Sequence, residues 1–369
     1  TINASAQELV GLNGNNNDYT VTVNGAVTVG QLNTIDLATT GVITALVGDT
    51  ADNLLSLTGT GNNYTVNVSS GASVSKLNAI DAKTIGVVSA TLTATAADLT
   101  TLTGTNNNYA LTVSGDATVA QLTTIDAATT GLMVYSSVKD SAANLLVDAA
   151  KNSGHGLYVS ESHAVEVTDA AGVTVSQLNS IRAATTGAIK ANIISTAGSL
   201  VGLTASANNN YTVTVSDDAS LSQLATIDQA TTGALSYGTV KDVAASLAAD
   251  ASSNAGAGLY VSGSHAVQVT DAATVAQLNT IDLATSGVVT ATISGYAADL
   301  VNLRPSGNNN YTITVSGTAT LSQLADIQRS TSGVITASVA DTAENLVGLT
   351  GVNQYALTVS NSASVAQLT

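Results

Sequence analysis

Apolar and polar residues alternate along this chain in two patterns that follow one another repeatedly. In the stretch 211–215, Tyr and Val alternate with Thr, which predicts a strand with one buried and one exposed face. In the stretch 28–36, Val29, Leu32 and Ile35 fall three residues apart, which is typical of the buried face of a short helix. The sequence therefore predicts alternating short strands and short helices.

The predicted helix carries a phrase that returns eight times: Ser or Thr, two small or apolar residues, usually Gln, then Leu, two polar residues, Ile and usually Asp. The steps between successive Leu residues are 45, 45, 56, 46, 54, 46 and 44. A nearly fixed period in this range indicates a repeat architecture, in which each unit buries its apolar face against its neighbours. The Leu residues of the phrase are Leu32, Leu77, Leu122, Leu178, Leu224, Leu278, Leu324 and Leu368.

A weaker copy of the same pattern lies between each pair of clear copies. The stretch 288–293 alternates as a strand does, and 297–303 has helical spacing. A strand of about six residues spans about 20 Å and a helix of about ten residues spans about 15 Å, so each helix can return the chain to the next parallel strand. We therefore predict one continuous α/β repeat solenoid over residues 1–369, with about sixteen half-repeats of about 22 residues, the last of them truncated.

In this architecture, which resembles that of a leucine-rich repeat, a parallel sheet is lined on one face by short helices. Strands stack about 4.8 Å apart whereas helices need about 10 Å, so the stack must curve, twist or splay its helices. The structural alternative is a pure parallel β-solenoid, in which the Leu-x-x-Ile segments are not helical.

The helix starts are marked by a Ser or Thr followed three residues later by Gln, the pattern of a capping box. Ser5/Glu8 and Asp341/Glu344 are expected to do the same in the weaker copies, and Ser73/Lys76 is expected to form a weaker cap. A closing Gly suits either a left-handed helix end or the turn into the next strand. The pairs with Gln are Thr118/Gln121, Thr174/Gln177, Ser220/Gln223, Thr320/Gln323 and Ser364/Gln367, and the glycines are Gly41, Gly86, Gly131, Gly187, Gly233, Gly287 and Gly333.

Two units, 132–187 and 234–287, are longer than the rest. Each contains an extended helical stretch, 138–151 or 240–250, followed by Gly-Leu-Tyr-Val-Ser and a histidine. We predict a lengthened helix and a protruding loop in each. Two copies this similar, about 100 residues apart, indicate a higher-order duplication.

Composition excludes several classes of function. The chain has nine Lys and Arg against 25 Asp and Glu, for a net charge of −16, which argues against binding to nucleic acid or to an anionic membrane surface. No run of about 18 apolar residues is present, so we expect no membrane span. The absence of Cys is compatible with secretion. Because the chain opens inside a repeat at Thr1 and stops inside a helix signal at Leu368-Thr369, we read it as an excerpt of a longer chain.

The Asp that follows Ile in the phrase is the best candidate for a functional ladder. Stacked carboxylates could collect Ca²⁺, a cation that takes six to eight oxygen ligands. The reading we favour is that each Asp caps the turn that follows it, because Arg182 and Gln328 hold the same position in two repeats. We expect no other cofactor. The candidate calcium ligands are Asp36, Asp81, Asp126, Asp228 and Asp282.

No other residues suggest catalysis. His155, His163 and His265 have no metal-binding spacing, and a structural or loop role is expected for them. No nucleophile motif, phosphate loop or paired carboxylate stands out, so we do not expect an enzyme. Asn-rich segments are expected to form turns, stacked as ladders. They lie at 15–17, 62–63, 106–108, 208–210 and 308–310.

Threonines spaced two apart are expected to form rows on the outer face of the sheet. Flat Thr arrays are the ice-binding surface of several β-solenoids, and these rows resemble one, although Thr also favours any exposed strand face. Asn67 and Leu111 are expected to interrupt the rows. The pairs are Thr20/Thr22, Thr212/Thr214, Thr290/Thr292 and Thr312/Thr314.

The phrases at 275–282, 341–346 and 267–277 look like repeats of giant secreted bacterial cell-surface proteins, common in cyanobacteria and found in surface-layer, adhesin-like and RTX-exported chains. The resemblance covers essentially the whole chain and implies an extracellular scaffold, frequently with calcium. We therefore expect a non-enzymatic, extracellular structural protein, a segment of a bacterial surface scaffold, filament or surface layer that self-associates end to end or laterally. The alternative is an adhesin-type module that binds a glycan or another ligand of the cell envelope, and ice binding is the least favoured reading.

Overall fold

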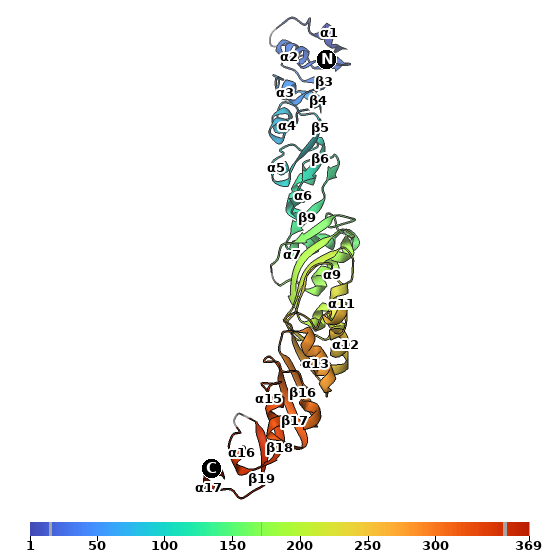
Figure 1. Ribbon diagram of the computed structural model, residues 1–369. Coiled ribbons are helices and arrows are strands. Elements are labelled where there is room, and N and C mark those ends of the chain that lie inside the picture. The colour runs from blue at the N-terminus through green and yellow to red at the C-terminus, as the bar shows by residue number, and fades with distance from the viewer. Residues whose placement is uncertain (15–16, 171, 350–352, 369) are drawn as a thin grey trace. The chain divides into compact units, whose positions relative to one another are not determined.

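Strands and helices alternate along the chain in the computed structural model, which describes residues 1–369 except 15–16, 171, 350–352 and 369 (Figure 1). The strands form three parallel sheets of seven, six and six members. The α/β class is therefore confirmed, and the pure β alternative is wrong because the Leu-x-x-Ile segments are helical. Two compact units divide the chain, residues 1–169 with 180–191 and residues 170–179 with 192–369, and each is described by itself.

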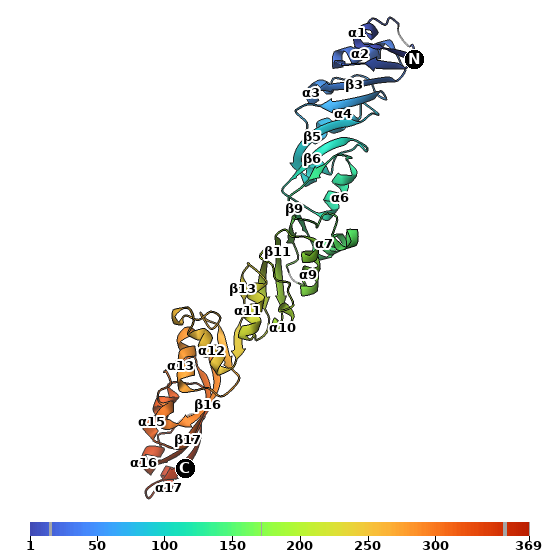
Figure 2. The same ribbon diagram turned by 90° about the vertical axis from the view of Figure 1, so that its right-hand side faces the viewer.

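The first sheet lies in the first unit and follows the chain in the order β1-β2-β3-β4-β5-β6-β8. In Figure 1, helices α2 to α5 lie along one side of this sheet, and Figure 2 shows strands β3 to β6 one after another. The strands are β1 (Ile2–Ser5), β2 (Val21–Asn24), β3 (Ile43–Asp49), β4 (Asn63–Val68), β5 (Val88–Thr95), β6 (Asn108–Ser114) and β8 (Met133–Val134). The helices are α1 (Ala6–Leu9), α2 (Val29–Ala38), α3 (Ala51–Leu54), α4 (Val74–Asp81), α5 (Ala96–Leu99) and α6 (Val119–Ala127).

The elements of the second sheet come next along the chain. Within the first unit, β9 pairs in parallel with β7 and with β10. The strands are β7 (Asp116–Ala117), β9 (Ser137–Asp140), β10 (Ala164–Val167), β11 (Ile189–Ser195), β12 (Asn209–Val215) and β13 (Leu235–Ser236). The helices are α7 (Ala142–Ala149), α8 (Lys151–Gly154), α9 (Val175–Ala184), α10 (Ala197–Leu200) and α11 (Leu221–Gln229).

The third sheet belongs to the second unit and again follows the chain, in the order β14-β15-β16-β17-β18-β19. Its strands are β14 (Thr239–Asp242), β15 (Ala266–Val269), β16 (Val289–Tyr296), β17 (Asn310–Ala319), β18 (Ile335–Asp341) and β19 (Gln354–Val359). The helices are α12 (Ala244–Ala251), the 3-10 turn η1 (Asn254–Gly256), α13 (Val275–Ala284), α14 (Ala297–Leu300), α15 (Leu321–Gln328), α16 (Ala343–Leu346) and α17 (Val365–Leu368).

Helix length alternates from one coil to the next. The clear copies of the phrase form helices such as α2, with ten residues, whereas the weaker copies in ordinary repeats form single turns such as α3, with four. The single turns are short because Thr and Gly residues follow the Leu-x-x-Leu segment and favour a turn. This alternation eases the mismatch between strand and helix spacing, since every second coil brings only one helical turn to its face.

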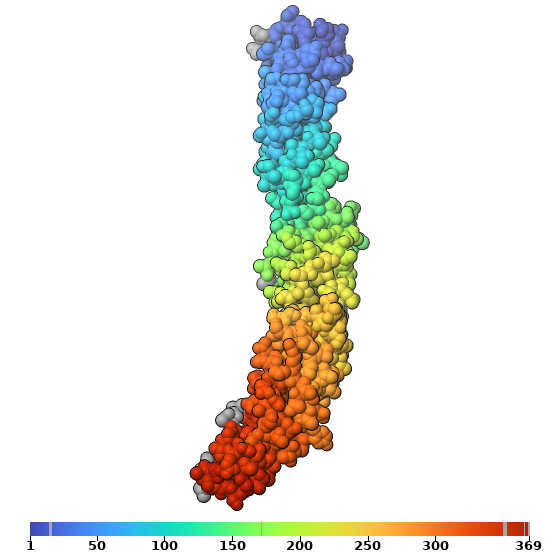
Figure 3. Space-filling view, viewed as in Figure 1, coloured from blue at the N-terminus to red at the C-terminus, as the bar shows by residue number. Residues whose placement is uncertain are grey.

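The Leu and Ile of the phrase build the core. Leu32 and Ile35 are 0% exposed, as are Leu77 and Ile80 in the next repeat. Four tyrosines, Tyr64, Tyr109, Tyr211 and Tyr311, add the largest buried side chains. On the face shown in Figure 3, the coils of the first unit pack against one another without a wide gap.

The helix caps follow the sequence closely, with one error. Full capping boxes are present at six helix starts, and Thr174 makes the same bonds with Gln177. Ser73 only accepts from the N–H of Lys76, which confirms the weaker cap. Asp341/Glu344 was the wrong pair: Thr342 holds the cap position, and Asp341 accepts instead from Thr342 N–H and the Asn345 amide. The boxes start at Ser5, Thr28, Thr118, Ser220, Thr274 and Thr320.

The closing glycines turn the chain into the next strand without a left-handed conformation. Gly86 illustrates the reason, because a Cβ there would overlap the carbonyl oxygen of Tyr64 on the preceding strand. The same overlap recurs at the other closing glycines. The glycine is therefore required by a close backbone approach, and the left-handed helix end is the wrong alternative.

The two long units contain the predicted longer helices, α7 and α12, each of eight residues. Each also divides its strand in two: β8 pairs with β6, and β9, two residues later, pairs with β7 and β10. The second long unit is divided in the same way between β13 and β14. A long unit is thus where one parallel sheet ends and the next begins.

Candidate functional site

A buried threonine stands two residues before each closing glycine and joins the starts of two neighbouring strands. Thr84 Oγ1 accepts from the N–H groups of Tyr64 and Gly86 at 2.8 and 3.0 Å. It also donates to the carbonyl oxygens of Tyr64 and Asn62 at 2.8 and 3.0 Å. We call this arrangement the threonine clamp. Thr39, Thr129 and Thr231 make the same four bonds, and Thr331 makes three of them. Thr185 and Thr285 of the long units also make three, because the N–H groups of His163 and His265 donate instead to Ser160 and Ser262.

An asparagine joins the intervening pair of strands in each of the first two ordinary repeats. Asn62 Oδ1 accepts from the N–H of Ile43 at 2.8 Å, and its Nδ2 donates to Asp36 at 2.9 Å. Asn107 makes the same two bonds with Val88 and Asp81. We call this pair of bonds the asparagine link. The predicted Asn ladder is therefore present at these positions, while Asn15 and Asn16 lie outside the described residues.

The five candidate aspartates do not cap their own turns, which overturns the reading we favoured. Asp36 and Asp81 are acceptors for the asparagine links of the next coil. Asp126 and Asp228 accept from the hydroxyls of Tyr158 and Tyr260, at 3.5 and 3.4 Å. The sequence pattern hid these partners because they lie more than 20 residues away, in the following coil.

Asp282 differs from the other four, because it is 5% exposed and pairs with Arg304 at 2.9 Å. Arg182, which replaces the aspartate in another repeat, donates to the carbonyl oxygen of Thr185. In the part of the chain that the structure describes, no three His, Asp or Glu side chains come together as a metal-ion site. Calcium binding by these aspartates therefore rests on the sequence pattern alone.

His163 and His265 occupy the position held by a buried tyrosine in ordinary coils. The ring of Tyr135 stacks on His163 with centroids 4.1 Å apart, and Tyr237 stacks on His265 at 4.0 Å. Tyr135 also donates to the carbonyl oxygen of Tyr158 at 3.0 Å, and burial raises the pKa of Tyr135 to about 12. The Tyr–His pair thus fills a core position, which agrees with the structural role expected.

His155 lies apart from the other two histidines, at the end of α8. It lines a hollow of about 530 Å³ together with Glu161 and Arg182. Glu161 has a left-handed backbone with φ of 50°, as do Asn152 and Ser153 with φ of 52° and 60°. These conformations belong to the protruding loop of the first long unit.

A buried carboxylate that the sequence analysis missed anchors this loop. Asp148 is 0% exposed, and its Oδ2 accepts from the N–H groups of Leu157, Tyr158 and Val159 at 3.3, 2.8 and 2.7 Å. Asp250 makes the equivalent three bonds in the second long unit. The signal was available, because an aspartate near the end of both lengthened helices stands ten residues before Tyr in each copy.

Four further asparagines, also missed, hold a helix of one coil to the turn of the next. Asn78 Nδ2 donates to the carbonyl oxygen of Thr101 at 2.7 Å, and its Oδ1 accepts from Thr103 N–H at 3.0 Å. Thr or Ala replaces this Asn before each long unit, at Thr123 and Ala225. The change from Asn to Thr or Ala at this position of the phrase was the signal available in the sequence. The four residues are Asn33, Asn78, Asn179 and Asn279.

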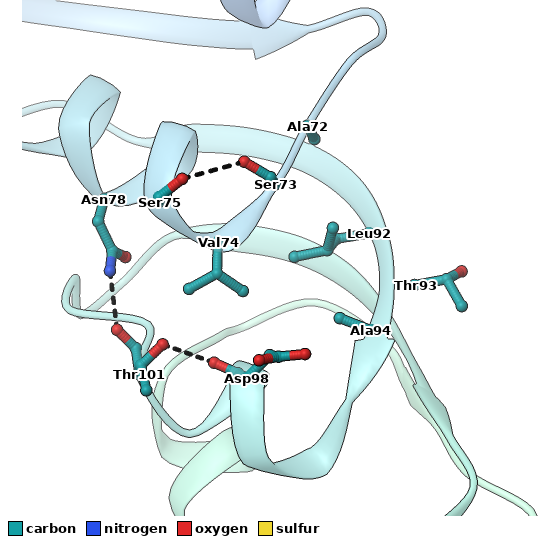
Figure 4. Close-up of a pocket in the computed structure, with 10 residues that line it drawn as sticks. All are labelled: Ala72, Ser73, Val74, Ser75, Asn78, Leu92, Thr93, Ala94, Asp98 and Thr101. Atoms are coloured by element: carbon teal, nitrogen blue, oxygen red, sulfur yellow. Dashed lines mark hydrogen bonds between the residues drawn. The ribbon is translucent and has the colours of Figure 1, made fainter.

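A hollow of about 510 Å³ lies in the first unit between the start of α4 and the turn α5 (Figure 4). Val74, Leu92 and Ala94 point into it, and Asp98 lies at one edge. Ser73 and Ser75 lie opposite, with their hydroxyl oxygens 3.3 Å apart. The hollow combines an apolar floor with a polar rim, which is the usual composition of a small-molecule site.

The outer face of the third sheet carries aligned hydroxyl residues. Thr292 pairs with Thr312, and Thr314 pairs with Thr336, so the predicted rows are present there. Gln354 ends the second row. In the first unit, Asn67 interrupts the outer face as expected, but Leu111 does not, because it is buried in the core.

Comparison of the sequence with protein-family models finds no match, and a search of curated proteins finds none either. None of the helices within the described ranges has both the length and the apolar character that a membrane span requires.

Proposed function

We propose that this chain is a non-enzymatic, extracellular structural protein that forms a segment of a bacterial cell-surface scaffold, filament or surface layer. In this proposal its coils stack as one continuous solenoid with the architecture of a leucine-rich repeat. The observation that carries the proposal is the threonine clamp, because a buried polar side chain joins neighbouring strand starts in every repeat. A protein that repeats the same internal bond along its length is built for extent and rigidity.

The polar residues of the phrase support the same role. Thr, Asn and Asp side chains bond mainly to the backbone or to each other within the stack, as in the bonds of Thr84, Asn62 and Asp36. Only 9% of residues are charged, but their balance of −16 makes copies repel one another, so salt should favour their association. The proposed partners are further copies, joined end to end or laterally.

Negative-stain imaging and small-angle scattering of the purified chain test this proposal. We expect rods of uniform width at low concentration, with filaments or lattices appearing as concentration rises. A variant with Thr84, Thr129 and Thr231 all changed to Val should give shorter or irregular rods, because three clamps are lost. Compact particles, or strictly monomeric rods at every concentration, would contradict the scaffold proposal.

The alternative is an adhesin-type module, and the hollow beside α4 is the observation that favours it. Its apolar floor and hydroxyl-rich rim suit a sugar better than a protein surface. Ice binding, the third reading, has only the short hydroxyl rows of the third sheet in its favour, and their ends at Gln354 make it the least favoured.

A further inference from the structure

The hollow beside α4 arises where the seam between two coils is open. In the first unit, Val27 forms a bridge with Val47, and Ala117 pairs with Val138, just before the helix begins. The second unit repeats this contact between Ala219 and Val240. The facing residues in the open seam are Ala72 and Leu92, and no bridge joins them among the described strand pairs. The equivalent Ala273 and Ile293 in the second unit also lack a bridge, but Ala273 is buried whereas Ala72 is half-buried.

The residue that departs from the repeat lies in the same seam. Lys76 replaces the Gln of the capping box, and its Nζ pairs with Asp52 of the preceding coil at 2.7 Å. Because lysine has no acceptor, it cannot bind the backbone N–H of Ser73 as Gln does elsewhere. In the same seam, Ala72 is half-buried, whereas its counterparts Val27 and Ala117 are buried; Val74 is half-buried, as is its counterpart Val119.

The lining of the hollow offers matched surfaces for a sugar ring. Val74, Leu92 and Ala94 provide an apolar floor for the C–H face of a pyranose, as Figure 4 shows. Asp98 Oδ2 accepts from Thr95 Oγ1 at 2.8 Å, which holds the carboxylate at the rim, where it can accept from ligand hydroxyls. The hydroxyls of Ser73 and Ser75 can both donate and accept.

The charge and the volume of the hollow restrict the class of ligand further. Asp98 is the one charged residue that lines the hollow, and the nearby Lys76 is directed to Asp52. An anionic sugar would meet a carboxylate without a cation to balance it. The volume of about 510 Å³ falls within the range of small-ligand sites, roughly 300–1,000 Å³, and accommodates a single sugar residue.

We propose that this hollow is a binding subsite for one neutral sugar residue of a glycan. The ring packs on Val74 and Leu92, and Asp98 accepts hydrogen bonds from two of its hydroxyls. The inference deepens the alternative adhesin function and is independent of the scaffold role. A failure to bind sugar would therefore leave the rods and filaments of the preceding proposal untouched.

Ligand NMR on the full chain, 1–369, tests the proposal with methyl glycosides of glucose, galactose, mannose and N-acetylglucosamine. We expect at least one of them to show saturation transfer and to shift the methyl signals of Val74 and Leu92. Glucuronate and glucosamine are the charged comparators. The subsite is overturned if none of the neutral sugars shifts these methyl signals, or if glucosamine binds more tightly than all of them, which would indicate an amine site.

Two variants tie the signal to the hollow. Asp98→Asn should weaken binding by about tenfold or more, since a charged acceptor is lost. The control is Asp299→Asn, because Ala297–Leu300 has the same Ala-Ala-Asp-Leu sequence as Ala96–Leu99 but lies outside this hollow. Ala94→Leu should abolish binding by filling the open space, and the thermal midpoint reports whether it still folds. Unchanged affinity in both Asp98→Asn and a folded Ala94→Leu would contradict the assignment.

Discussion

The ordinary repeats and the long units solve the same packing problem with different side chains. Both keep the threonine clamp, with Thr84 in an ordinary coil and Thr185 in a long one. In the first two ordinary repeats the other strand pair is joined by an asparagine link, such as that of Asn62. In the long unit, Glu161 stands at that position, two residues before the clamped His163, and a buried carboxylate and a ring stack lie beside it.

The difference shows which part of the repeat is fixed and which part is free to vary. The clamp bonds to backbone groups that every coil must satisfy, so it survives the insertion. The asparagine link also needs an Asn in the coil after the aspartate. In the long units Glu161 and Gly263 hold that position, and the aspartates accept from tyrosine hydroxyls instead. The long unit contains a buried acceptor of its own, Asp148, and ends the sheet at the same place.

The largest expected effect comes from removing that acceptor. Asp148→Ala leaves two buried N–H groups and one half-buried N–H group without a partner, and we expect a loss of about 3 kcal/mol in unfolding free energy. Urea denaturation measures the loss, and hydrogen exchange at 157–159 should rise first. Asp250→Ala, in which the carboxylate is only half-buried, should cost less. Equal losses in the two variants would show that burial does not set the cost.

Removing the clamp hydroxyl should have the second-largest effect on stability, and the loss should be similar in ordinary repeats and long units. Thr84→Val keeps the shape of the side chain but removes the hydroxyl that bonds to Tyr64 and Gly86, at a cost of about 2 kcal/mol. Thr185→Val in the first long unit should cost a similar amount. The midpoint of chemical unfolding checks both. A marked difference would break the claim that the clamp is the shared element.

Asn78→Ala should cost about 1 kcal/mol, because two hydrogen bonds to the turn of the next coil are lost at a partly exposed site. The matched variant is Thr123→Ala, at the same position before a long unit, where the hydroxyl donates to Val119 of its own helix and also contacts the hydroxyl of Tyr158. We expect a smaller loss than for Asn78→Ala, because no backbone group of the next coil loses a partner. Thermal unfolding of the two variants side by side would sharpen the comparison, and a reversed order would contradict it.

Alkaline pH should destabilise ordinary repeats through their buried tyrosines. Burial, and after it the charge of Asp36, raises the pKa of Tyr64 well above its usual value of about 10. Because the folded-state pKa is raised, this contribution to stability is complete below about pH 10, the usual pKa of tyrosine. It is lost progressively as pH rises from there through the folded-state pKa. Tyr260 in the long unit is more accessible, and burial raises its pKa only to about 12.

Urea denaturation between pH 9 and 13 tests this difference, which opens above about pH 12, where Tyr260 ionises in the folded chain while Tyr64 does not. Over that full range Tyr64→Phe should reduce the loss of stability with rising pH more than Tyr260→Phe does. If both variants keep the slope of the parent chain, tyrosine ionisation does not control the alkaline limit.

The smallest expected effect is that of calcium. Asp36 and Asp81 each already bind an asparagine, and Asp282 binds Arg304, so a cation would have to displace these partners. We expect the thermal midpoint to stay unchanged when a chelator is added. A clear fall of the thermal midpoint with chelator, reversed by Ca²⁺ but not by Mg²⁺, would support calcium binding by the aspartates.

The elements were predictable from the sequence because their signals are local. Helix starts such as Thr28 follow from residues three positions apart, and the buried Leu32 and Ile35 follow from helical spacing. The one-turn length of α3 and the division of the strand around Tyr135 were not foreseen. Both depend on how neighbouring coils fit, which no local pattern contains.

The bonding partners of the site residues were the part that sequence reasoning could not reach. Asp36 has a plausible acceptor role in its own turn, yet its actual partner, Asn62, lies 26 residues later. Such a pairing depends on the register between coils, which only the three-dimensional structure fixes. The open seam beside α4 combines both kinds of information, since the odd Lys76 is visible in the sequence but the resulting space is not.

The threonine clamp also has a genetic consequence. Each ordinary repeat contributes a clamp, which acts on its own turn and on the strand before it. An in-frame duplication or loss of a whole repeat therefore leaves each remaining donor with an acceptor. We expect the gene to gain and lose repeats by unequal recombination, so that alleles differ in length in steps of one repeat while every product still folds.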